Sequence, residues 1–170
     1  MKVPFAEIAE DGTKYDITDA SWFPEQDLVR LAPVSATLLL VRKAAGRVEI
    51  QGHLETTVEL QCDRCLKPYG LRIDTSIDLI LECPDEEHWK LREVACSAED
   101  LDTVVLREPI ADLDDVLRQQ LYLALPFKQL CATGCKGLCS RCGADLNQGP
   151  CGCDPGENLS PFAVLAKLKK

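Results

Sequence analysis

Two long stretches of the chain alternate almost without a break between apolar and polar residues, and this pattern limits the fold more than any other feature. The apolar side chains of each stretch share one parity: Val48, Ile50, Leu54, Val58, Leu60 and Cys62 in residues 47–62, and Leu71, Ile73, Ile77, Leu79, Leu81 and Cys83 in residues 71–83. A period of two is typical of a strand with one buried face. Both stretches are therefore predicted strands, and Gly52 is a predicted bulge or bend in the first.

The connector between these strands, residues 62–70, is rich in turn-forming residues. Consecutive strands joined by such a connector pair as an antiparallel hairpin. The pattern therefore predicts a hairpin whose tip carries Cys62-Asp-Arg-Cys65. Further strands are expected at residues 38–41 and 101–106.

Two helices are expected in the second half of the chain. After Pro109, Asp112 is a suitable N-cap, and apolar residues recur at helical spacing up to Pro126. The pair Ser160-Pro161 begins a second, short amphipathic helix.

A sheet with one apolar face needs a covering layer. The predicted fold class is therefore α+β: an antiparallel β-sheet covered by one or two helices, with a cysteine-rich zinc-knuckle segment near the C-terminus. We expect residues 1–126 to form the core. Residues 127–170 would form the zinc-binding segment with its short helix, docked on the core as one unit.

Six of the ten cysteines fall between residues 131 and 153, interleaved with glycines. Four thiolates that converge on one zinc ion at about 2.3 Å need sharp backbone turns, and glycine permits them. The spacing predicts one self-contained zinc site from Cys139, Cys142, Cys151 and Cys153. A second site would combine Cys62 and Cys65 of the hairpin tip with Cys131 and Cys135.

Three other uses of these cysteines stay open: disulfides, a redox Cys-x-x-Cys at Cys62 and Cys65, and an iron–sulfur cluster. Cys83 continues the apolar face of its strand and is expected in the core, whereas Cys96 has no partner by spacing. The N-terminal residues lack the features of a secretory signal, and no apolar run reaches the roughly 20 residues of a membrane span. We therefore expect a cytoplasmic protein with reduced thiols and no membrane partner.

The formal net charge of -9 is unevenly distributed along the chain. Residues 74–115 hold 14 acidic against three basic residues, whereas residues 116–170 hold three acidic against seven basic ones. The overall charge excludes a uniformly basic nucleic-acid binder, yet the C-terminal part is mildly basic. An acidic middle segment is either solvated surface or a surface for a basic partner.

No pattern in the chain points to catalysis or to a small-molecule substrate. His53 is expected on the polar face of a strand and His88 in an acidic loop, and neither adjoins a nucleophile. A zinc ion with four cysteine ligands has no open position for water and is structural. We therefore expect that the protein is not an enzyme.

Three segments carry a family resemblance: Cys62-Asp-Arg-Cys-Leu-Lys-Pro-Tyr69; Leu123-Ala-Leu-Pro-Phe-Lys-Gln-Leu-Cys131 with Cys135-Lys-Gly-Leu-Cys-Ser-Arg-Cys-Gly-Ala-Asp-Leu-Asn147 and Cys151-Gly-Cys153; and Ser160-Pro-Phe-Ala-Val-Leu-Ala-Lys-Leu-Lys169. Together they resemble the YceD family (DUF177) of bacterial and plastid large ribosomal RNA subunit accumulation proteins. The resemblance begins near Leu38, and Asp145 stands where that family often has Asn.

The resemblance implies a non-catalytic factor that supports synthesis, processing or accumulation of 23S rRNA and assembly of the large ribosomal subunit. From charge, we expect rRNA or a pre-ribosomal particle to contact Lys128, Lys136, Arg141, Lys167, Lys169 and Lys170. The acidic middle segment would then face a basic ribosomal protein or repel non-specific RNA. Two alternatives stay open: a chaperone or adaptor that binds a basic ribosomal protein without RNA contact, and a Cys-x-x-Cys redox protein.

Overall fold

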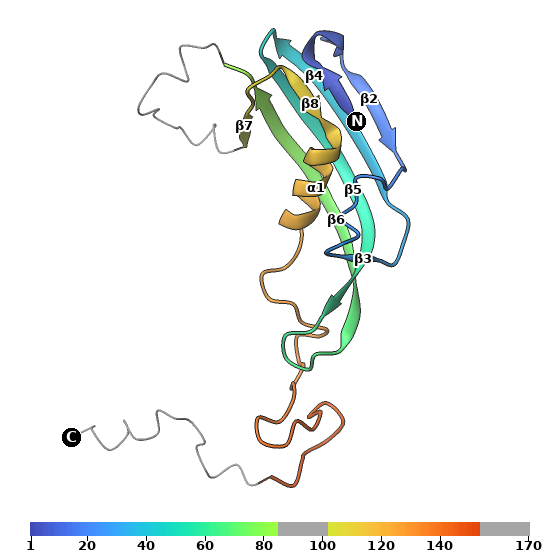
Figure 1. Ribbon diagram of the computed structural model, residues 1–170, viewed down its shortest axis with the longest axis vertical. Helices are drawn as coiled ribbons and strands as arrows, with labels where there is room; N and C mark the ends of the chain where they lie inside the picture. The colour runs from blue at the N-terminus through green and yellow to red at the C-terminus, as the bar shows by residue number, and fades with distance from the viewer. Residues whose placement is uncertain (85–101, 154–170) are drawn as a thin grey trace, which may run out of the picture. The chain divides into compact units, whose positions relative to one another are not determined.

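A computed structural model describes residues 1–84 and 102–153 of the chain (Figure 1). The chain divides into two compact units. The sheet unit comprises Met1–Leu60 and Pro68–Lys128, and the cysteine unit comprises Gln61–Lys67 and Gln129–Lys170. This division groups the hairpin tip with the cysteine-rich segment, whereas the sequence suggests one boundary after residue 126. Docking of the two as one unit stays a prediction.

A six-stranded sheet forms most of the sheet unit. Its strands are β2 (Thr13–Ile17), β3 (Val29–Arg30), β4 (Ser35–Ala44), β5 (Arg47–Gln61), β6 (Pro68–Glu82) and β7 (Thr103–Val105). They lie in the order β2-β4-β5-β6-β7, and β3 pairs with β5. A separate two-stranded sheet pairs β1 (Lys2–Pro4) with β8 (Ile110–Asp112). A single 3₁₀ turn, Phe5–Glu7, follows β1.

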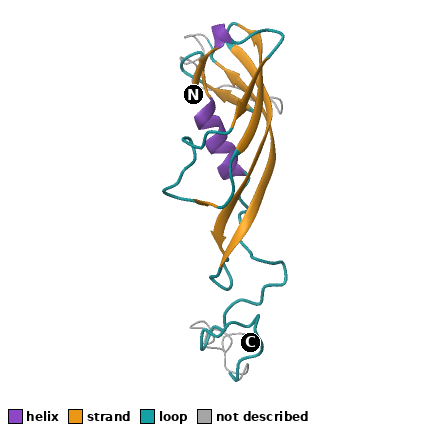
Figure 2. Ribbon diagram, turned by 90° about the vertical axis from the view of Figure 1, so that its right-hand side faces the viewer, coloured by secondary structure: helices purple, strands orange, loops and turns teal. Residues whose placement is uncertain are grey.

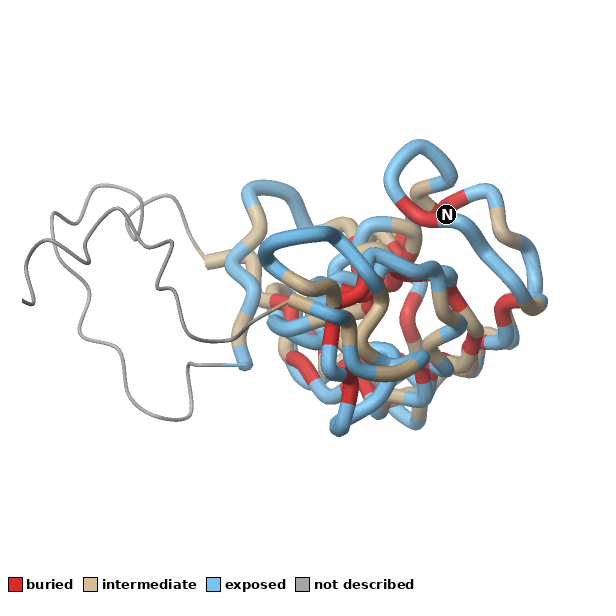
Figure 3. The backbone as a smooth tube through the Cα atoms, turned by 90° about the horizontal axis from the view of Figure 1, so that it is seen from below, coloured by how far each residue is buried: buried red, intermediate tan, exposed pale blue. Residues whose placement is uncertain are grey.

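The two predicted strands of residues 47–62 and 71–83 are confirmed as β5 and β6, which are neighbours in the sheet and run in opposite directions (Figure 1). Their apolar parity points inward, because Val48, Ile50, Leu54 and Val58 are fully buried. Buried residues alternate with exposed or half-buried ones along β5 and β6. Figure 3 shows how buried and exposed segments are interleaved along the backbone. The predicted strands at residues 38–41 and 101–106 correspond to β4, which is longer, and β7, which is shorter.

The structure adds two details to the predicted sheet. The pairing of β4 with β5 runs without interruption through Leu38 opposite Gly52, so this ladder has no bulge there, and its register shifts between Arg42 and Ala44 instead. The sheet is also not purely antiparallel, because β7 pairs with β6 in parallel. A parallel pair needs a crossover of a dozen or more residues, and residues 83–102 are long enough to supply it.

The helix α1 (Leu113–Leu123) covers one face of the sheet, as Figure 2 shows. Its apolar stripe is buried through Leu113, Val116, Leu117 and Leu121. This spacing is that of an amphipathic helix on a core. The predicted start is confirmed, since the Asp112 side chain accepts a hydrogen bond from Asp115 N–H (3.4 Å). The second predicted helix, residues 160–169, lies outside the described residues.

Replacing Asp112 by alanine should lower the free energy of unfolding of the sheet unit by about 1 kcal/mol, because the first turn of α1 loses its capping acceptor. Urea denaturation followed by circular dichroism measures the change. Asp11→Ala, in an exposed loop, is the matched control and should leave the midpoint unchanged. Equal midpoints for the two variants would show that the cap contributes nothing.

The N-terminal residues contribute to the core although they carry no predicted element. Phe5, Ile8 and Trp22 are nearly fully buried in the same hydrophobic cluster as β5 and α1. The strand β2 pairs with β4 in the register Tyr15 to Leu38. Within residues 1–84 and 102–153, no helix is both long enough and apolar enough to cross a membrane.

Candidate metal centre

The hairpin tip brings two cysteines to the same side of a tight turn. Cys62 N–H donates to the carbonyl oxygen of Lys67 (2.9 Å), and Leu66 N–H donates to that of Cys62 (2.9 Å). Leu66 closes the turn with φ of 60°, in the left-handed region that non-glycine residues seldom adopt. Cys62 and Cys65 are both buried. The local fold thus presents a pair of sulfurs inside the cysteine unit.

The segment after Gln129 bonds to this tip and supplies the second pair of sulfurs. Asp63 N–H donates to Gln129 O (2.8 Å), and Gln129 N–H donates to the Asp63 carboxylate (2.7 Å). Arg64 Nη1 donates to Cys135 O (2.7 Å). These bonds hold Cys131 and Cys135 against the hairpin tip, about 70 residues away in sequence.

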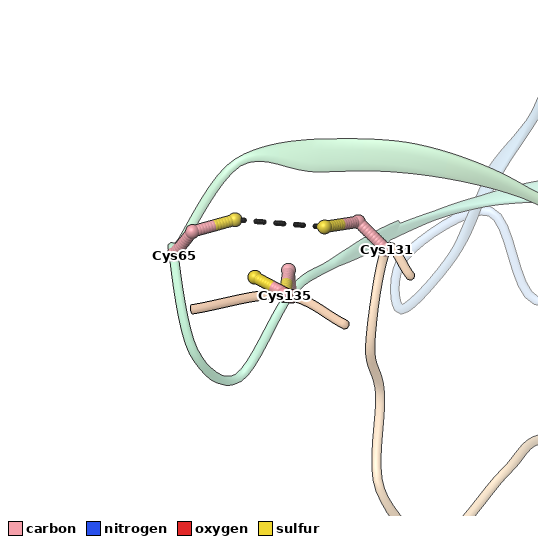
Figure 4. Close-up of side chains that lie close together, drawn as sticks. Cys65, Cys131 and Cys135 are labelled. Carbon is pink, nitrogen blue, oxygen red and sulfur yellow. Dashed lines mark hydrogen bonds between the residues drawn. The ribbon is translucent and has the colours of Figure 1, made fainter. Parts of the chain in front are cut away.

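The four sulfurs of Cys62, Cys65, Cys131 and Cys135, here called the first tetrad, all lie within 4.8 Å of one another. The Cys62–Cys135 sulfurs are 3.8 Å apart and the Cys65–Cys131 sulfurs 3.7 Å. Figure 4 shows the sulfurs of Cys65, Cys131 and Cys135, which point toward one another. Sulfurs at tetrahedral corners about 2.3 Å from a zinc ion would be roughly 3.8 Å apart. The first tetrad therefore fits one tetrahedral ion.

Cys139, Cys142, Cys151 and Cys153 form the second tetrad, whose sulfurs also lie within 4.8 Å of one another. Gly143 N–H donates to Cys139 O (2.9 Å), and Cys139 N–H donates to Ala144 O (2.8 Å). Gly143 has φ of 71°, which a side chain would disfavour. The knuckle thus needs glycine after its second cysteine.

These are the two groupings that the cysteine spacing predicts, and metal ligation by them stays a prediction. The cysteines of the described residues are all free thiols, and sulfurs 3.7 Å apart are well beyond the disulfide bond length of about 2.05 Å. The predicted position of Cys83 in the core is partly met, since it is half-buried against the hydrophobic cluster. Cys96 and His88 lie outside the described residues.

Backbone hydrogen bonds favour a thiolate in each tetrad. Hydrogen bonds from the backbone at Cys131 and Cys65 lower the pKa of Cys62 to about 6. Those at Cys142 and Arg141 lower the pKa of Cys139 to about 6. Side-chain hydrogen bonds to neighbouring cysteines and burial raise the pKa of Cys131 and of Cys153 to about 12. Each tetrad therefore has one cysteine, Cys62 or Cys139, that favours the thiolate at neutral pH, which is the form that binds metal.

Three residues beside the first tetrad escape sequence reasoning. Lys67 Nζ and the Asp145 carboxylate form an ion pair at 2.6 Å, which lowers the pKa of Asp145 and raises that of Lys67. The Asn147 side chain donates to Cys135 Sγ (3.4 Å). No periodicity marks these residues, and the available signal is that Lys67 lies in the segment of residues 62–69 and Asp145 and Asn147 lie in that of residues 135–147, both of which carry the family resemblance.

The cationic side chains expected to contact RNA are exposed where the structure describes them. Lys128, Lys136 and Arg141 are exposed, whereas the three terminal lysines (Lys167, Lys169 and Lys170) lie outside the described residues. His53 lies on the polar face of β5, as predicted, and is 3.2 Å from the Asp74 carboxylate. Both partners of that pair are about half exposed, so it is an ordinary surface contact.

A site closed by four sulfurs can stabilise a fold but leaves no ligand position for a substrate. With a divalent cation bound, such a site would have a net charge of about −2, because four thiolates supply two more charges than the cation neutralises. Arg64 and Lys67 lie close to the first tetrad and would partly offset this excess if an ion were bound. The chemistry of the donor set is therefore that of a structural metal centre.

Comparison with known proteins places these features in one family. The family model described as "Large ribosomal RNA subunit accumulation protein YceD" matches residues 50–169, which include both tetrads. No solved structure matches the chain.

Three relatives show how far the similarity extends. A maize protein named "Large ribosomal RNA subunit accumulation protein YCED homolog 1, chloroplastic" is 32% identical to this chain. The match covers 75% of this chain and 52% of the length of the maize protein. The Arabidopsis thaliana protein of the same name is 25% identical over 81% of this chain and 49% of its own. The chain thus spans about half the length of these plant relatives. An uncharacterized Mycobacterium bovis protein is 26% identical over 88% of this chain and 72% of its own.

Proposed function

Because the chain belongs to the YceD family of large ribosomal RNA subunit accumulation proteins, we propose that it supports accumulation of the 23S rRNA and assembly of the large ribosomal subunit as a non-catalytic factor of the cytoplasm. The observation that carries this proposal is the family match over residues 50–169. The plant relatives are named for large ribosomal RNA subunit accumulation. The protein would act by binding, since its two cysteine tetrads have the donor set of structural sites.

The proposal includes one structural zinc ion in each tetrad. All-sulfur tetrahedral donors suit zinc. The separations of 3.7 and 3.8 Å in the first tetrad suit a single ion, and the sulfurs of the second tetrad also lie within 4.8 Å of one another. An iron–sulfur cluster fits less well, because its cysteines bind different iron atoms and are spread more widely. When bound, the ions would supply folding energy to a segment poor in apolar residues.

A redox role for Cys62 and Cys65 has less support than zinc binding. Both residues are buried, at 0% and 4% exposure, so the disulfide of a partner could not reach their sulfurs. A reactive Cys-x-x-Cys needs an accessible attacking thiolate. The hairpin tip therefore suits a structural role.

The RNA-facing part of the proposal assigns the contacts to Lys128, Lys136, Arg141 and the three terminal lysines. Two zinc sites would make the described part of the cysteine unit slightly negative overall, because each adds two negative charges. Binding to phosphate would therefore depend on where these cations are placed and not on net charge.

Depletion of the protein should lower the ratio of large-subunit to small-subunit rRNA, and the wild-type gene should restore it. Quantifying both rRNAs by capillary electrophoresis tests this. An unchanged ratio after complete depletion would contradict the proposed function.

Lys136→Gln with Arg141→Gln should weaken association with pre-ribosomal particles and flatten its salt dependence. Each lost phosphate contact reduces the slope of log K against log salt by roughly 0.7 to 0.9. Sedimentation at several salt concentrations measures the slope. Lys14→Gln with Lys43→Gln, two exposed lysines of the sheet unit, is the charge-matched control. Equal slopes for the two variants would contradict the RNA-facing assignment.

A cavity in the sheet unit favours the second candidate, an adaptor for a basic ribosomal protein. This cavity, of about 470 Å³, has four aspartates in its lining, Asp78, Asp102, Asp112 and Asp115, and no Lys or Arg among its described lining residues. Its remaining lining is largely apolar, including Leu79, Val104 and Leu123. A basic partner that stays bound after nuclease treatment would favour the adaptor over direct RNA binding.

A further inference from the structure

The two tetrads are separated along the chain by only three residues, and two of these contact the hairpin tip. Leu138 N–H donates to Arg64 O (3.1 Å), while Arg64 Nη1 donates to Cys135 O (2.7 Å). Gly137 has φ of +76°, and a Cβ there would lie 2.8 Å from Arg64 O. This link is therefore fixed against the turn that carries Cys62 and Cys65, with no room for a side chain at Gly137.

The chain returns from the second tetrad to the first between Gly143 and Asn147. Leu146 N–H donates to Gly137 O (2.9 Å), and Leu138 and Asp145 form an isolated antiparallel bridge. This short pairing places Asn147 beside Cys135, although Asn147 lies in sequence between Cys142 and Cys151 of the second tetrad. The loop of residues 143–147 thus follows Cys142 of the second tetrad and contacts Cys135 of the first.

The Asn147 side chain is held by three hydrogen bonds. Its Oδ1 accepts from Lys136 N–H (2.8 Å), and its Nδ2 donates to Asp145 Oδ1 (2.8 Å) and to Cys135 Sγ (3.4 Å). A donor to a ligand sulfur orients that sulfur and stabilises its thiolate form. Loss of such outer partners typically costs 10- to 100-fold in metal affinity.

We propose that Asn147 is a positioning residue for the first tetrad, and that a metal ion in the second tetrad thereby raises the affinity of the first for its own ion. This inference rests on the zinc-binding proposal above. An ion at Cys139, Cys142, Cys151 and Cys153 would order the loop that carries Asn147, so the first tetrad would no longer bear that entropic cost. By linkage, the first ion must favour the second by the same factor.

Titration of the reduced full-length protein with Co²⁺ and then Zn²⁺, in competition with a chelator, measures the coupling. Cys142→Ser disables the second tetrad and should lower the affinity of the first about tenfold. Asn147→Ala should lower that affinity by a similar factor with both tetrads intact. Combining the two substitutions should lower the affinity of the first tetrad no further than Asn147→Ala does. Without the Asn147 side chain, the second tetrad no longer acts on Cys135.

A spectroscopic signature separates positioning from general loosening of the fold. In Asn147→Ala the sulfur-to-cobalt charge-transfer band of the first tetrad should move to longer wavelength, because Cys135 loses a hydrogen-bond donor. The band of the second tetrad should stay in place. Gln148→Ala, at the exposed neighbouring position, is the control and should change neither affinity nor spectrum.

The titration tests the coupling between the tetrads separately from zinc binding itself. Two ions bound with independent affinities, unaltered by Cys142→Ser, would overturn the coupling and leave zinc binding intact. Failure of the wild-type chain to bind either ion would overturn both. A change in rRNA levels bears on the proposed function and on neither of these outcomes.

Discussion

Replacing Cys135 by serine should reduce bound zinc from two ions per chain to one and unfold the cysteine unit around the hairpin tip. Cys135 is buried, its sulfur lies 3.8 Å from that of Cys62, and its carbonyl accepts from Arg64. Structural zinc sites contribute about 10–16 kcal/mol of binding energy in zinc-finger peptides, which in such segments is folding energy. The sheet unit should keep its structure, because its hydrophobic core is built from its own residues.

Elemental analysis of protein purified under reducing conditions measures the zinc content. Limited trypsin digestion reports the unfolding, because Lys136 and Arg141 are cleavage sites within the cysteine unit. Cys83→Ser is the matched control, since Cys83 is a half-buried cysteine of the sheet unit outside both tetrads. Two zinc ions retained in Cys135→Ser would contradict the first tetrad as a metal site.

Replacing Gly52 by alanine should destabilise the sheet unit by about 3 kcal/mol or more, because overpacking against backbone cannot relax by side-chain rotation. A Cβ at Gly52 would lie 2.3 Å from Thr37 O and 2.7 Å from Leu38 Cδ2. Gly52 stands opposite Leu38 at the centre of the β4–β5 ladder, so the clash would push the two strands apart.

Gly70→Ala is the control for this prediction, since it also adds one methyl group to a glycine of the same hairpin. A Cβ there would meet only the Leu31 side chain at 3.3 Å and the Thr57 side chain at 3.6 Å, both of which can move. Urea denaturation should therefore give a much lower midpoint for Gly52→Ala than for Gly70→Ala. Similar midpoints would show that the ladder accommodates the methyl group.

The features of the fold that are predictable from the sequence are those with a local period. The parity of β5 and β6, the apolar stripe of α1 and the capping Asp112 depend on neighbours within a few residues. Gly52 illustrates the limit of this reasoning. Its sequence context marks an interruption of the pattern, but only the position of Leu38 across the ladder explains why glycine is required.

The parts that escape prediction involve partners far apart in sequence. The strand β2 has a sequence pattern, since Thr13, Tyr15 and Ile17 alternate with charged residues, but a pattern of five residues predicts a strand only weakly. Its pairing with β4 depends on residues about 20 positions away. The parallel pairing of β6 with β7 has no local signature in the sequence, because the residues within a strand do not encode the direction of its neighbour.

Spacing along the chain predicts which cysteines pair locally, because the short interval within each pair lets the backbone turn two sulfurs toward one point. The folded chain brings Cys131 and Cys135 to Cys62 and Cys65, and it sets which residues surround each tetrad. The contacts of Lys67 with Asp145, of Arg64 with Cys135 and of Asn147 with Cys135 join residues 12 to 78 positions apart. Such contacts arise from how the hairpin tip and the cysteine-rich loop fold onto each other. A periodic pattern reports only on neighbours a few residues apart, so it does not predict contacts between residues so far apart in sequence.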